Sequence, residues 1–425
     1  MRLLPSRRAV TVIATAALIS AVAVVAPVSA APSEAATAAA AATSAYPTGS
    51  TSLKTPAAGG TTIWVSTTGR DFIDLRHPDG HVESYKRSYC IGNAASADWV
   101  KKQCPAANSS NPVRTLQMAM LLVKPGDVVV ARGGTYKESV SNNGKAGTAA
   151  KPIVVQNAPG ERVVIAGRYV FTGADHWLVW GLRFTYDATT SNTYGLVTFA
   201  GGTGWTFRGN DVSGSRRTAN VMVTTETATG TSTAARVAAA PHDWTIVGNV
   251  IHENKGQDAA GTDHNLYLLS SIWGTNGVVE RNLIWGAPRG ANIKAAGSSD
   301  PNESPRDVAI RYNTMLYAGS GVTLGLKAEG IVIWRNVIGA PQGEAYNSGG
   351  IKTYRIAQPA KNLAKYNYIA GYKYPYYTDP GAGQIVKASN VIKQTALALT
   401  GSVTDDTVRP ADASVNTSYG RNFGQ

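Results

Sequence analysis

The segments DWTIVGNVI (Asp243–Ile251) and GVVERNLIW (Gly277–Trp285) each place an asparagine directly after a short run of alternating apolar residues. Three residues before the asparagine stands an aliphatic side chain, Ile246 or Val279, and another follows two residues after it. This spacing predicts a strand, a sharp turn and a second strand. Asparagine suits such a turn because it tolerates the left-handed backbone conformation.

The same motif recurs along the second half of the chain. Its asparagines are Asn210, Asn249, Asn282, Asn313, Asn336 and Asn367. A third alternating run follows each turn, as in NLYLL around Leu266 and NIKAA around Ile293. Three short strands in each repeat of roughly 22 to 30 residues predict a parallel β-helix whose asparagines stack from coil to coil. A β-sandwich would instead need hairpin turns at short, regular spacing and would not keep one asparagine in register.

With this repeat, the chain resembles the pectate-lyase-like right-handed β-helix proteins, which are secreted and mostly act on polysaccharides. The likeness extends from Ile63 to about Val391, and its N-terminal part carries IWVSTTGRD and NPVRTLQMAMLLVKPGDVVVARGGTYKESV. The resemblance implies an all-β fold, a right-handed parallel β-helix solenoid over residues 59–395. It also implies an amphipathic helix, 114–123, that caps the open end of the solenoid. Because the superfamily includes lyases, hydrolases and epimerases, activity has to be argued from the site.

Residues 1–30 predict a signal peptide, since Arg2, Arg7 and Arg8 precede an apolar run that ends in the small residues 28–30 (VSA). An uncleaved membrane anchor is the alternative, and the two adjacent arginines also fit a twin-arginine signal. We expect a secreted protein without stable membrane insertion. Residues 31–58, rich in Ala, Thr and Ser, predict a disordered lead-in. Residues 396–425 form a tail that we expect to pack on or cap the solenoid.

The net charge indicates the class of binding partner, and the cysteine content indicates a disulfide. The formal net charge is +13, or +10 once the three arginines of the leader are removed with no acidic residue. This excess favours a polyanionic partner such as an acidic polysaccharide, although a basic composition also serves solubility. Nucleic acid is disfavoured because no binding module or run of clustered basic residues is present. Cys90 and Cys104 are the only cysteines, and in an exported chain they predict a disulfide.

The resemblance implies a substrate groove along the outer face of one parallel sheet. If Leu266, Ile293, Val322 and Ile351 point inward, their successors Tyr267, Lys294, Thr323 and Lys352 point outward. Lys294 and Lys352, two coils apart, would then lie about 10 Å from each other. The other candidates for contact with a sugar are His264, Arg289, Asn292, Tyr354, Arg355, Trp273 and Trp285.

Lys294 is the candidate base for a β-elimination from a uronic acid. The base has to remove the proton beside a carboxylate whose charge is neutralised. A neighbouring cation lowers the pKa of a lysine, because like charges disfavour the protonated form. For neutralisation the candidates are Arg289, Lys352 and Arg355, and for protonation of the leaving oxygen they are Tyr267 and His264.

Other interpretations stay open. Glu253, Asp258 and Asp263 would supply oxygen ligands if calcium bridges substrate and protein. A hydrolase would need paired carboxylates, which this strand lacks because Ala291 and Asn292 occupy the expected positions. The stretch TDH ending at His264 faintly suggests a uronate epimerase. A non-catalytic glycan-binding or adhesive protein, with Lys294 solvated and His264 bonded to a loop carbonyl, is the remaining alternative. We expect the protein to be a monomer.

Overall fold

The computed structural model describes residues 52–92, 97–190, 195–256, 263–343 and 348–421. All of them belong to one compact unit, Ala45–Gln425. The predicted signal peptide and most of the predicted lead-in lie outside the described residues. No helix among the described residues is long and apolar enough to cross a membrane.

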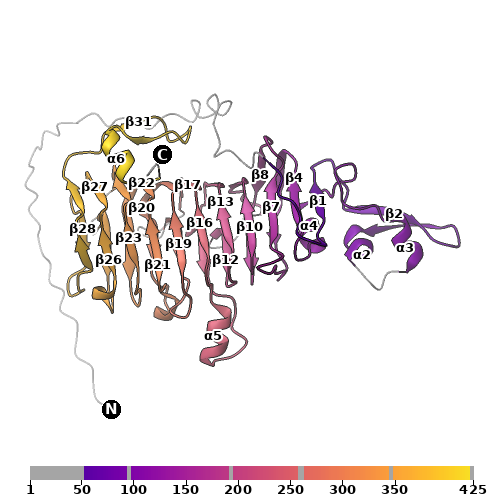
Figure 1. Cartoon of the computed structure of the whole chain (residues 1–425), viewed down its shortest axis with the longest axis horizontal. Coiled ribbons are helices and arrows are strands. Elements are labelled where there is room, and N and C mark those ends of the chain that lie inside the picture. The colour runs from indigo at the N-terminus through magenta and orange to yellow at the C-terminus, as the bar shows by residue number, and fades with distance from the viewer. Residues whose placement is uncertain (1–51, 93–96, 191–194, 257–262, 344–347, 422–425) are drawn as a thin grey trace, which may run out of the picture. The chain divides into compact units, whose positions relative to one another are not determined.

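The strands form three columns, in which each strand pairs in parallel with its counterpart one coil away (Figure 1). The first column is β1 (Thr62–Val65), β4 (Val128–Ala131), β7 (Ile153–Asn157), β10 (Trp177–Trp180), β13 (Thr206–Arg208), β16 (Thr245–Val247), β19 (Gly277–Glu280), β21 (Val308–Arg311), β23 (Val332–Trp334), β26 (Leu363–Lys365) and β29 (Val386–Ala388). The second is β5 (Gly134–Lys137), β8 (Val163–Ala166), β11 (Arg183–Thr185), β14 (Asp211–Ser213), β17 (Val250–His252), the first parts of β20 (Leu283–Ala295) and β22 (Thr314–Gly325), β24 (Val337–Gly339), β27 (Tyr368–Ala370) and β30 (Val391–Lys393). The third is β6 (Val140–Ser141), β9 (Tyr169–Thr172), β12 (Gly195–Ala200), β15 (Ala219–Thr224), β18 (His264–Leu268), the last parts of β20 and β22, β25 (Ile351–Tyr354) and β28 (Tyr376–Thr378).

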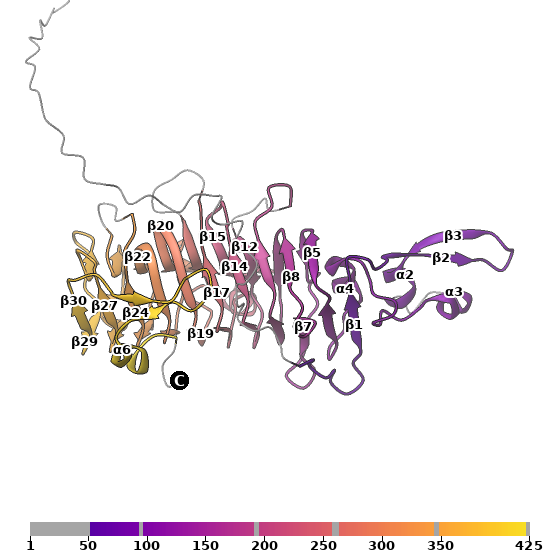
Figure 2. The ribbon, with the colours of Figure 1, turned by 90° about the horizontal axis from the view of Figure 1, so that it is seen from above.

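Figure 2 shows the same stack of coils from a second direction. The predicted fold class, an all-β right-handed parallel β-helix, is confirmed by these parallel columns. β20 and β22 run without a break from the second column into the third, with a register shift between Ala287 and Ala291. The two ends of each of these strands therefore lie on different faces of the solenoid.

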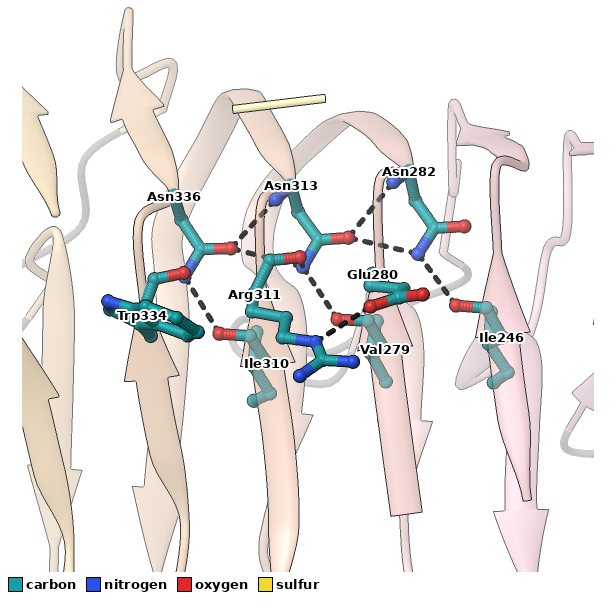
Figure 3. Close-up of polar contacts among 9 residues, drawn as sticks. All are labelled: Ile246, Val279, Glu280, Asn282, Ile310, Arg311, Asn313, Trp334 and Asn336. Atoms are coloured by element: carbon teal, nitrogen blue, oxygen red, sulfur yellow. Dashed lines mark hydrogen bonds and ion pairs between the residues drawn. The ribbon is translucent and has the colours of Figure 1, made fainter. Parts of the chain in front are cut away.

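A hydrogen-bonded asparagine ladder lies at the turn between the first two columns (Figure 3). Asn313 is typical: its Nδ2 donates to Asn336 Oδ1 at 3.0 Å and to the carbonyl of Val279 at 2.9 Å. Its own Oδ1 accepts from the backbone N–H and the Nδ2 of Asn282 at 3.0 and 2.9 Å. The ladder consists of Asn210, Asn249, Asn282, Asn313, Asn336, Asn367 and Asn390. The predicted stack is thus confirmed and extends one coil further.

The residue before each ladder asparagine has a positive φ. It is a glycine in the first two coils, Gly209 and Gly248, and a larger residue afterwards, including Arg281 with φ 54° and Tyr312 with φ 56°. A left-handed residue turns the chain sharply enough for the following asparagine to reach into the interior. There its amide satisfies backbone groups that the turn leaves without a strand partner.

The interior changes character along the axis. In the N-terminal coils the rings of Phe171, Phe199, Trp205 and Trp244 stack in sequence, with centroids 4.6, 4.0 and 5.4 Å apart. In the first column of strands, Phe207 is followed in later coils by the aliphatic residues Ile246, Val279, Ile310 and Ile333, all fully buried. Like side chains pack on like, so one continuous core runs through the stack.

Helix α4 (Leu116–Leu122) forms within the predicted range 114–123 and buries Leu116 and Met120 in the main core. Its first turn is fixed by Thr115, whose side chain accepts from Met118 N–H, and by Glu138, which accepts from the first two helical N–H groups. That this helix closes the end of the solenoid stays a prediction.

An excursion between β1 and α4 holds an antiparallel hairpin, β2 (Phe72–Arg76) and β3 (Val82–Lys86), with the helices α2 (Arg87–Gly92) and α3 (Asp98–Gln103). It has a small core of its own that includes Leu75 and Val100. The predicted disulfide between Cys90 and Cys104 is confirmed and joins the two helical segments. The excursion is thus fixed by a covalent link as well as by packing.

The remaining elements are α5 (Thr233–Ala239), the 3-10 turns η2 (Pro301–Glu303) and η3 (Pro359–Lys361), β31 (Leu399–Thr400), β32 (Arg409–Pro410) and α6 (Ala413–Ser418). The C-terminal segment packs on the outer face of the second column. There Val408 and Leu397 cover Val250, Leu283 and Leu316. Residues of the tail thus bury an apolar stripe that three successive coils would otherwise expose.

Candidate active site

A row of outward-facing residues crosses the third column, one from each coil. Strand register aligns Val170, Thr198, Met222, Tyr267, Lys294, Thr323, Lys352 and Tyr377. The inward neighbours Leu266, Ile293 and Val322 are fully buried. The predicted alternation of inward and outward residues around Lys294 is therefore confirmed, and we call this set the outward row.

A pocket of about 800 Å³ lies over the outward row, and we call it the Lys294 pocket. Val170, Thr198, Met222 and Tyr267 line it from the row. Its charged and titratable lining residues are Arg168, Glu226, His264, Lys294 and Glu303. Sequence reasoning identified Lys294, His264 and Tyr267, and it missed the other three.

Lys294 is half-buried between two aromatic rings. Its Nζ lies 4.4 Å from the ring centroid of Tyr267 and 6.0 Å from that of Tyr354. Burial, and then the positive charge of Lys352, lower the pKa of Lys294 to about 8. The ring faces attract the ammonium and act in the opposite direction. With a pKa near 8, a useful fraction of the amine is neutral close to neutral pH, as a general base requires.

Tyr267 supports Lys294 through its ring. Its hydroxyl donates to the carbonyl of Gly297 at 3.1 Å, and the residue is only 4% exposed. Burial raises the pKa of this phenol, so it keeps its proton. Because that proton is already engaged by Gly297, Tyr267 suits positioning of the lysine better than proton donation to a substrate.

His264 is a neutral hydrogen-bond donor. Its Nδ1 accepts from the backbone N–H of Ala291 at 3.2 Å, which places the ring proton on Nε2. Burial, and then the charge of Lys294, hold the pKa of His264 well below 6.5. The ring is 3% exposed, and its Nε2 has no hydrogen-bond partner among the described residues. A buried N–H of this kind gains most from a ligand that accepts its hydrogen bond.

Arg168 contributes a second such donor. Its Nε is buried without a partner in the described part of the chain, and burial lowers the pKa of the guanidinium. Arginine still stays charged, because its ordinary pKa lies far above neutral pH. The Lys294 pocket therefore presents a permanent cation, a neutral N–H donor and a titratable amine, a combination suited to an anionic ligand.

Two carboxyl groups also line the Lys294 pocket. Glu226 lies against Gly201, where a Cβ would approach within 2.8 Å of the glutamate side chain, and burial followed by the charge of Asp175 raises the pKa of Glu226. Glu303 accepts from the backbone N–H of Ser298 at 3.2 Å and from its hydroxyl. Glu226 sits in an irregular segment and Glu303 in the 3-10 turn η2, both between strands, where no periodic pattern could place them in advance.

The other predicted charged residues lie outside the Lys294 pocket. Arg289 Nε donates to Asp263 at 2.8 Å, and Arg289 also donates to the carbonyl of Lys255 at 3.3 Å. Lys352 continues the outward row, with its Nζ 5.7 Å from the ring of Tyr377. Arg355 lines a separate pocket of about 620 Å³ beyond it. Of these cations, Lys352 is the one that lowers the pKa of Lys294.

Asn292 does not contact a substrate, and that prediction is wrong. Its side chain is fully buried, accepts from Asn265 Nδ2 at 2.9 Å and donates to the carbonyl of Leu316 at 3.0 Å. Asn220 continues this short ladder by donating to Asn265 at 2.9 Å. The signal was present in the sequence, since each of the third-column runs NVMVT, NLYLL and NIKAA begins with asparagine.

The prediction for Trp285 is also wrong. Trp285 lies in the second-column part of β20, stacks on His252 with centroids 4.6 Å apart and is 8% exposed. It packs under the C-terminal tail, on a different face from Lys294. Trp273 packs against Arg236, whose guanidinium carbon lies 4.8 Å from its ring centroid, and it is not among the described residues that line the Lys294 pocket.

The proposed calcium ligands are occupied or undescribed. Asp263 pairs with Arg289, and Glu253 lies 3.3 Å from His252 Nδ1. Asp258 lies outside the described residues. A calcium ion would have to displace a basic partner from each of the two described carboxylates.

No family model and no curated protein sequence match this chain. Solved structures similar to it include the pectate lyase Pel9A, with 13% identity, a TM-score of 0.46 and coverage of 81% of this chain and 79% of that chain. XylC in complex with xylose matches at 12% identity, with a TM-score of 0.49 and coverage of 79% of this chain and 67% of that chain. A glycoside hydrolase matches at 10% identity, with a TM-score of 0.46 and coverage of 85% of this chain and 99% of that chain. The parallel β-helix is established by the strand register of this chain.

Proposed function

We propose that this protein is a polysaccharide lyase that cleaves a uronic-acid-containing polysaccharide by β-elimination, with Lys294 as the base. The observation that carries the proposal is the set of groups in the Lys294 pocket. Lys294 has a pKa near 8, and the donor atoms His264 Nε2 and Arg168 Nε lack partners among the described residues of the same pocket. Uronate carboxylates of one bound chain supply the acceptors that these donors lack, one at His264 and another at Arg168, three coils away.

Binding of the substrate carboxylate makes the neighbouring C5 proton easier to remove. A hydrogen bond from His264 Nε2 to the carboxylate would stabilise the negative charge that builds up on it when the neighbouring C5 proton leaves. Arg168, three coils from His264, would bind another carboxylate of the same polymer. His264 performs this task as a neutral donor, because the charge of Lys294 and burial keep the ring from taking a second proton. Met222 and Leu269 provide an apolar surface in the same pocket for the face of a sugar ring.

Elimination then balances without water. The Lys294 amine takes the C5 proton, the C5 electron pair forms the C4–C5 double bond, and the bond from C4 to the glycosidic oxygen breaks. We assign protonation of the leaving oxygen to Tyr354, whose ring lies 6.0 Å from Lys294 Nζ and whose pKa burial raises to about 12. Lys294 finally returns its proton through Tyr354 or solvent, which restores both groups.

Export and a monomeric state belong to this proposal. The basic and apolar leader supports secretion, and the positive net charge of +13 supports an acidic polysaccharide as partner. An extended polymer would reach the outward row from solvent, since that row lies on the outer face of the solenoid.

A glycoside hydrolase is the second candidate, favoured by one specific observation. Glu226 and Glu303 line the same pocket, and the pKa of Glu226 is raised, as suits a general acid. In that mechanism one carboxyl protonates the leaving oxygen while the other activates water or attacks the sugar. Lys294 would then serve only to bind the substrate.

Incubation with a panel of acidic polysaccharides separates these functions. A lyase produces the ultraviolet absorbance of the unsaturated uronide in step with new reducing ends. New reducing ends without that absorbance would reject the lyase and support the hydrolase. Uptake of deuterium at C5 in heavy water without chain cleavage would indicate an epimerase, and saturable binding with neither product would indicate a glycan-binding protein.

A further inference from the structure

The hairpin formed by β2 and β3 carries a pair of histidines outside the Lys294 pocket. His77 follows β2 and His81 precedes β3, and the turn between them contains Pro78 and Gly80, the latter with φ 94°. The backbone N–H of His77 donates to the carbonyl of His81 at 2.8 Å, which closes the turn. The two imidazole rings stack with centroids 3.8 Å apart.

Glu83 completes a set of three side chains that suit a metal ion. Its Oε2 lies 3.2 Å from His77 Nε2, and one ligand atom from each of His77, His81 and Glu83 lies within 4.8 Å of the others. Around tetrahedral zinc, with bonds of about 2.0–2.2 Å, ligand atoms lie roughly 3.3–3.6 Å apart. The Tyr85 hydroxyl donates to Glu83 Oε2 at 2.6 Å and lies 2.9 Å from His77 Nε2, so a metal ion would displace this hydroxyl as the side chains rotate into coordinating positions.

A second carboxylate orients one of the histidines. Asp79 Oδ1 lies 2.6 Å from His81 Nδ1, which fixes the ring and leaves Nε2 as the coordinating nitrogen. Carboxylate partners of this kind commonly hold metal-binding histidines in the correct tautomer. Asp79 and Glu83 give the cluster two negative charges that a divalent cation would balance.

The support beneath the cluster is rigid. The ring of Trp99, in α3, lies 4.3 Å from that of His77, and α3 is tied to α2 through the disulfide between Cys90 and Cys104. Leu75 and Val100 are buried beneath the same hairpin. The ligating side chains thus stand on a braced hairpin, with His77 largely covered and the His81 and Glu83 side chains more than half exposed.

We propose that His77, His81 and Glu83 bind one divalent transition-metal ion of the zinc type, with a water as the fourth ligand. Imidazole nitrogen with a single carboxylate suits Zn²⁺, whereas Ca²⁺ and Mg²⁺ prefer sites built from oxygen ligands. The site lies in the excursion before α4 and is independent of the function proposed for the Lys294 pocket. Bound metal would link the two strands of the hairpin at its tip.

Calorimetric titration of the metal-stripped full-length protein with ZnCl₂ tests the proposal. We expect one Zn²⁺ to bind per chain, and His81→Ala and Glu83→Gln each to weaken binding by about tenfold or more through loss of a ligand. His242→Ala is the matched control, because His242 lies in a turn of the solenoid and hydrogen-bonds to Thr275. Circular dichroism should show that all variants keep the wild-type fold.

Zn²⁺ binding that persists in a His77→Ala/His81→Ala double variant would overturn the proposal, as would a wild-type protein that takes up no Zn²⁺. If the double variant does not fold, Co²⁺ added to the wild-type protein decides. We expect the visible d–d absorption of a tetrahedral site, reversed by excess Zn²⁺. Absence of these bands, or equal binding of Ca²⁺, would contradict the assignment.

Discussion

Two columns of residues run along this solenoid, and they follow opposite rules. The asparagine ladder repeats one residue type from Asn210 to Asn390, with the same hydrogen bonds in every coil. The outward row changes at each coil, from Val170 through Tyr267 and Lys294 to Tyr377. The ladder is buried, whereas Lys294 stands at a pocket.

This difference indicates which positions of a repeat protein are candidates for catalysis or binding. Each coil makes the same turn, so the same backbone groups need hydrogen-bond partners in every coil, and an asparagine amide supplies them each time. An outward position faces no such common demand, so a change of residue type there reports on a ligand or on solubility. A disruption of the ladder should therefore affect stability, and a disruption of the row should affect activity.

The largest effect should come from Lys294. Lys294→Ala should lower kcat/KM on the acidic polysaccharide by about 10²–10⁴-fold, the usual contribution of a general base. Lys294→Arg should be nearly as damaging, because a guanidinium does not release its proton. The melting temperature should stay close to that of the wild type, and initial rates of absorbance increase measure the loss.

Thr323→Val is the matched control for Lys294, since Thr323 occupies the same position one coil away. It should keep most of the activity. Full activity in Lys294→Arg would reject the lysine as the base. Retained polysaccharide binding in Lys294→Arg without any turnover in the wild type would indicate a binding protein.

Breaking the ladder should give the converse result. Asn313→Ala removes hydrogen bonds to Asn282, Asn336 and Val279 and leaves buried polar groups unpaired, which should lower the free energy of unfolding by about 2–4 kcal/mol. The folded fraction should keep its kcat/KM. Denaturant unfolding measures the change, and Asn390→Ala, at the half-buried end of the ladder, should show a smaller one.

Asn292 sharpens the comparison because it is a structural residue close to the candidate base. It is buried in the separate short ladder with Asn220 and Asn265, yet it lies two positions before Lys294 on β20. Asn292→Ala should lower the free energy of unfolding by about 1–3 kcal/mol. It should also lower kcat by less than Lys294→Ala does, since it disturbs only the backbone that carries the lysine. An unchanged stability would show that the short ladder is not a structural element.

The smallest effect concerns pH. Activity should rise with pH as Lys294 loses its proton, with a midpoint near its pKa of about 8. Lys352→Met removes the neighbouring positive charge, so the ammonium becomes easier to keep and the midpoint should move to higher pH by less than about one unit. A midpoint that moves downward, or a profile that falls between pH 6 and 8, would contradict the role of Lys294 as base.

The sequence allowed most of the fold to be predicted, because its determinants repeat. The register of Leu266, Ile293 and Val322 follows from alternation, and the ladder follows from asparagine spacing. The outward position of Lys294 follows from the same alternation. Its lowered pKa was predicted from a neighbouring cation that was left unspecified; the structure gives burial as the larger cause and Lys352 as the cation.

The predictions that failed concern residues whose positions depend on contacts outside the repeat. Trp285 precedes Lys294 by only nine positions, yet β20 turns a corner between them, so the two lie on different faces. Arg168, Glu226 and Glu303 reach the pocket from irregular segments or strand ends whose path depends on tertiary packing. Asn292 was misplaced because a polar residue beside Lys294 was assumed to share its exposure.

The C-terminal tail has a consequence for how this molecule comes apart. In a solenoid each coil touches only its neighbours, so a terminal coil can peel away without disturbing the rest. Here Val408 and Leu397 lie across Val250, Leu283 and Leu316 from three successive coils, and Arg421 N–H donates to Thr314 Oγ1. Detaching the last coils also requires these contacts of the tail to break, which couples several coils into one cooperative unit. The tail converts stepwise fraying from that end into a single, more abrupt transition.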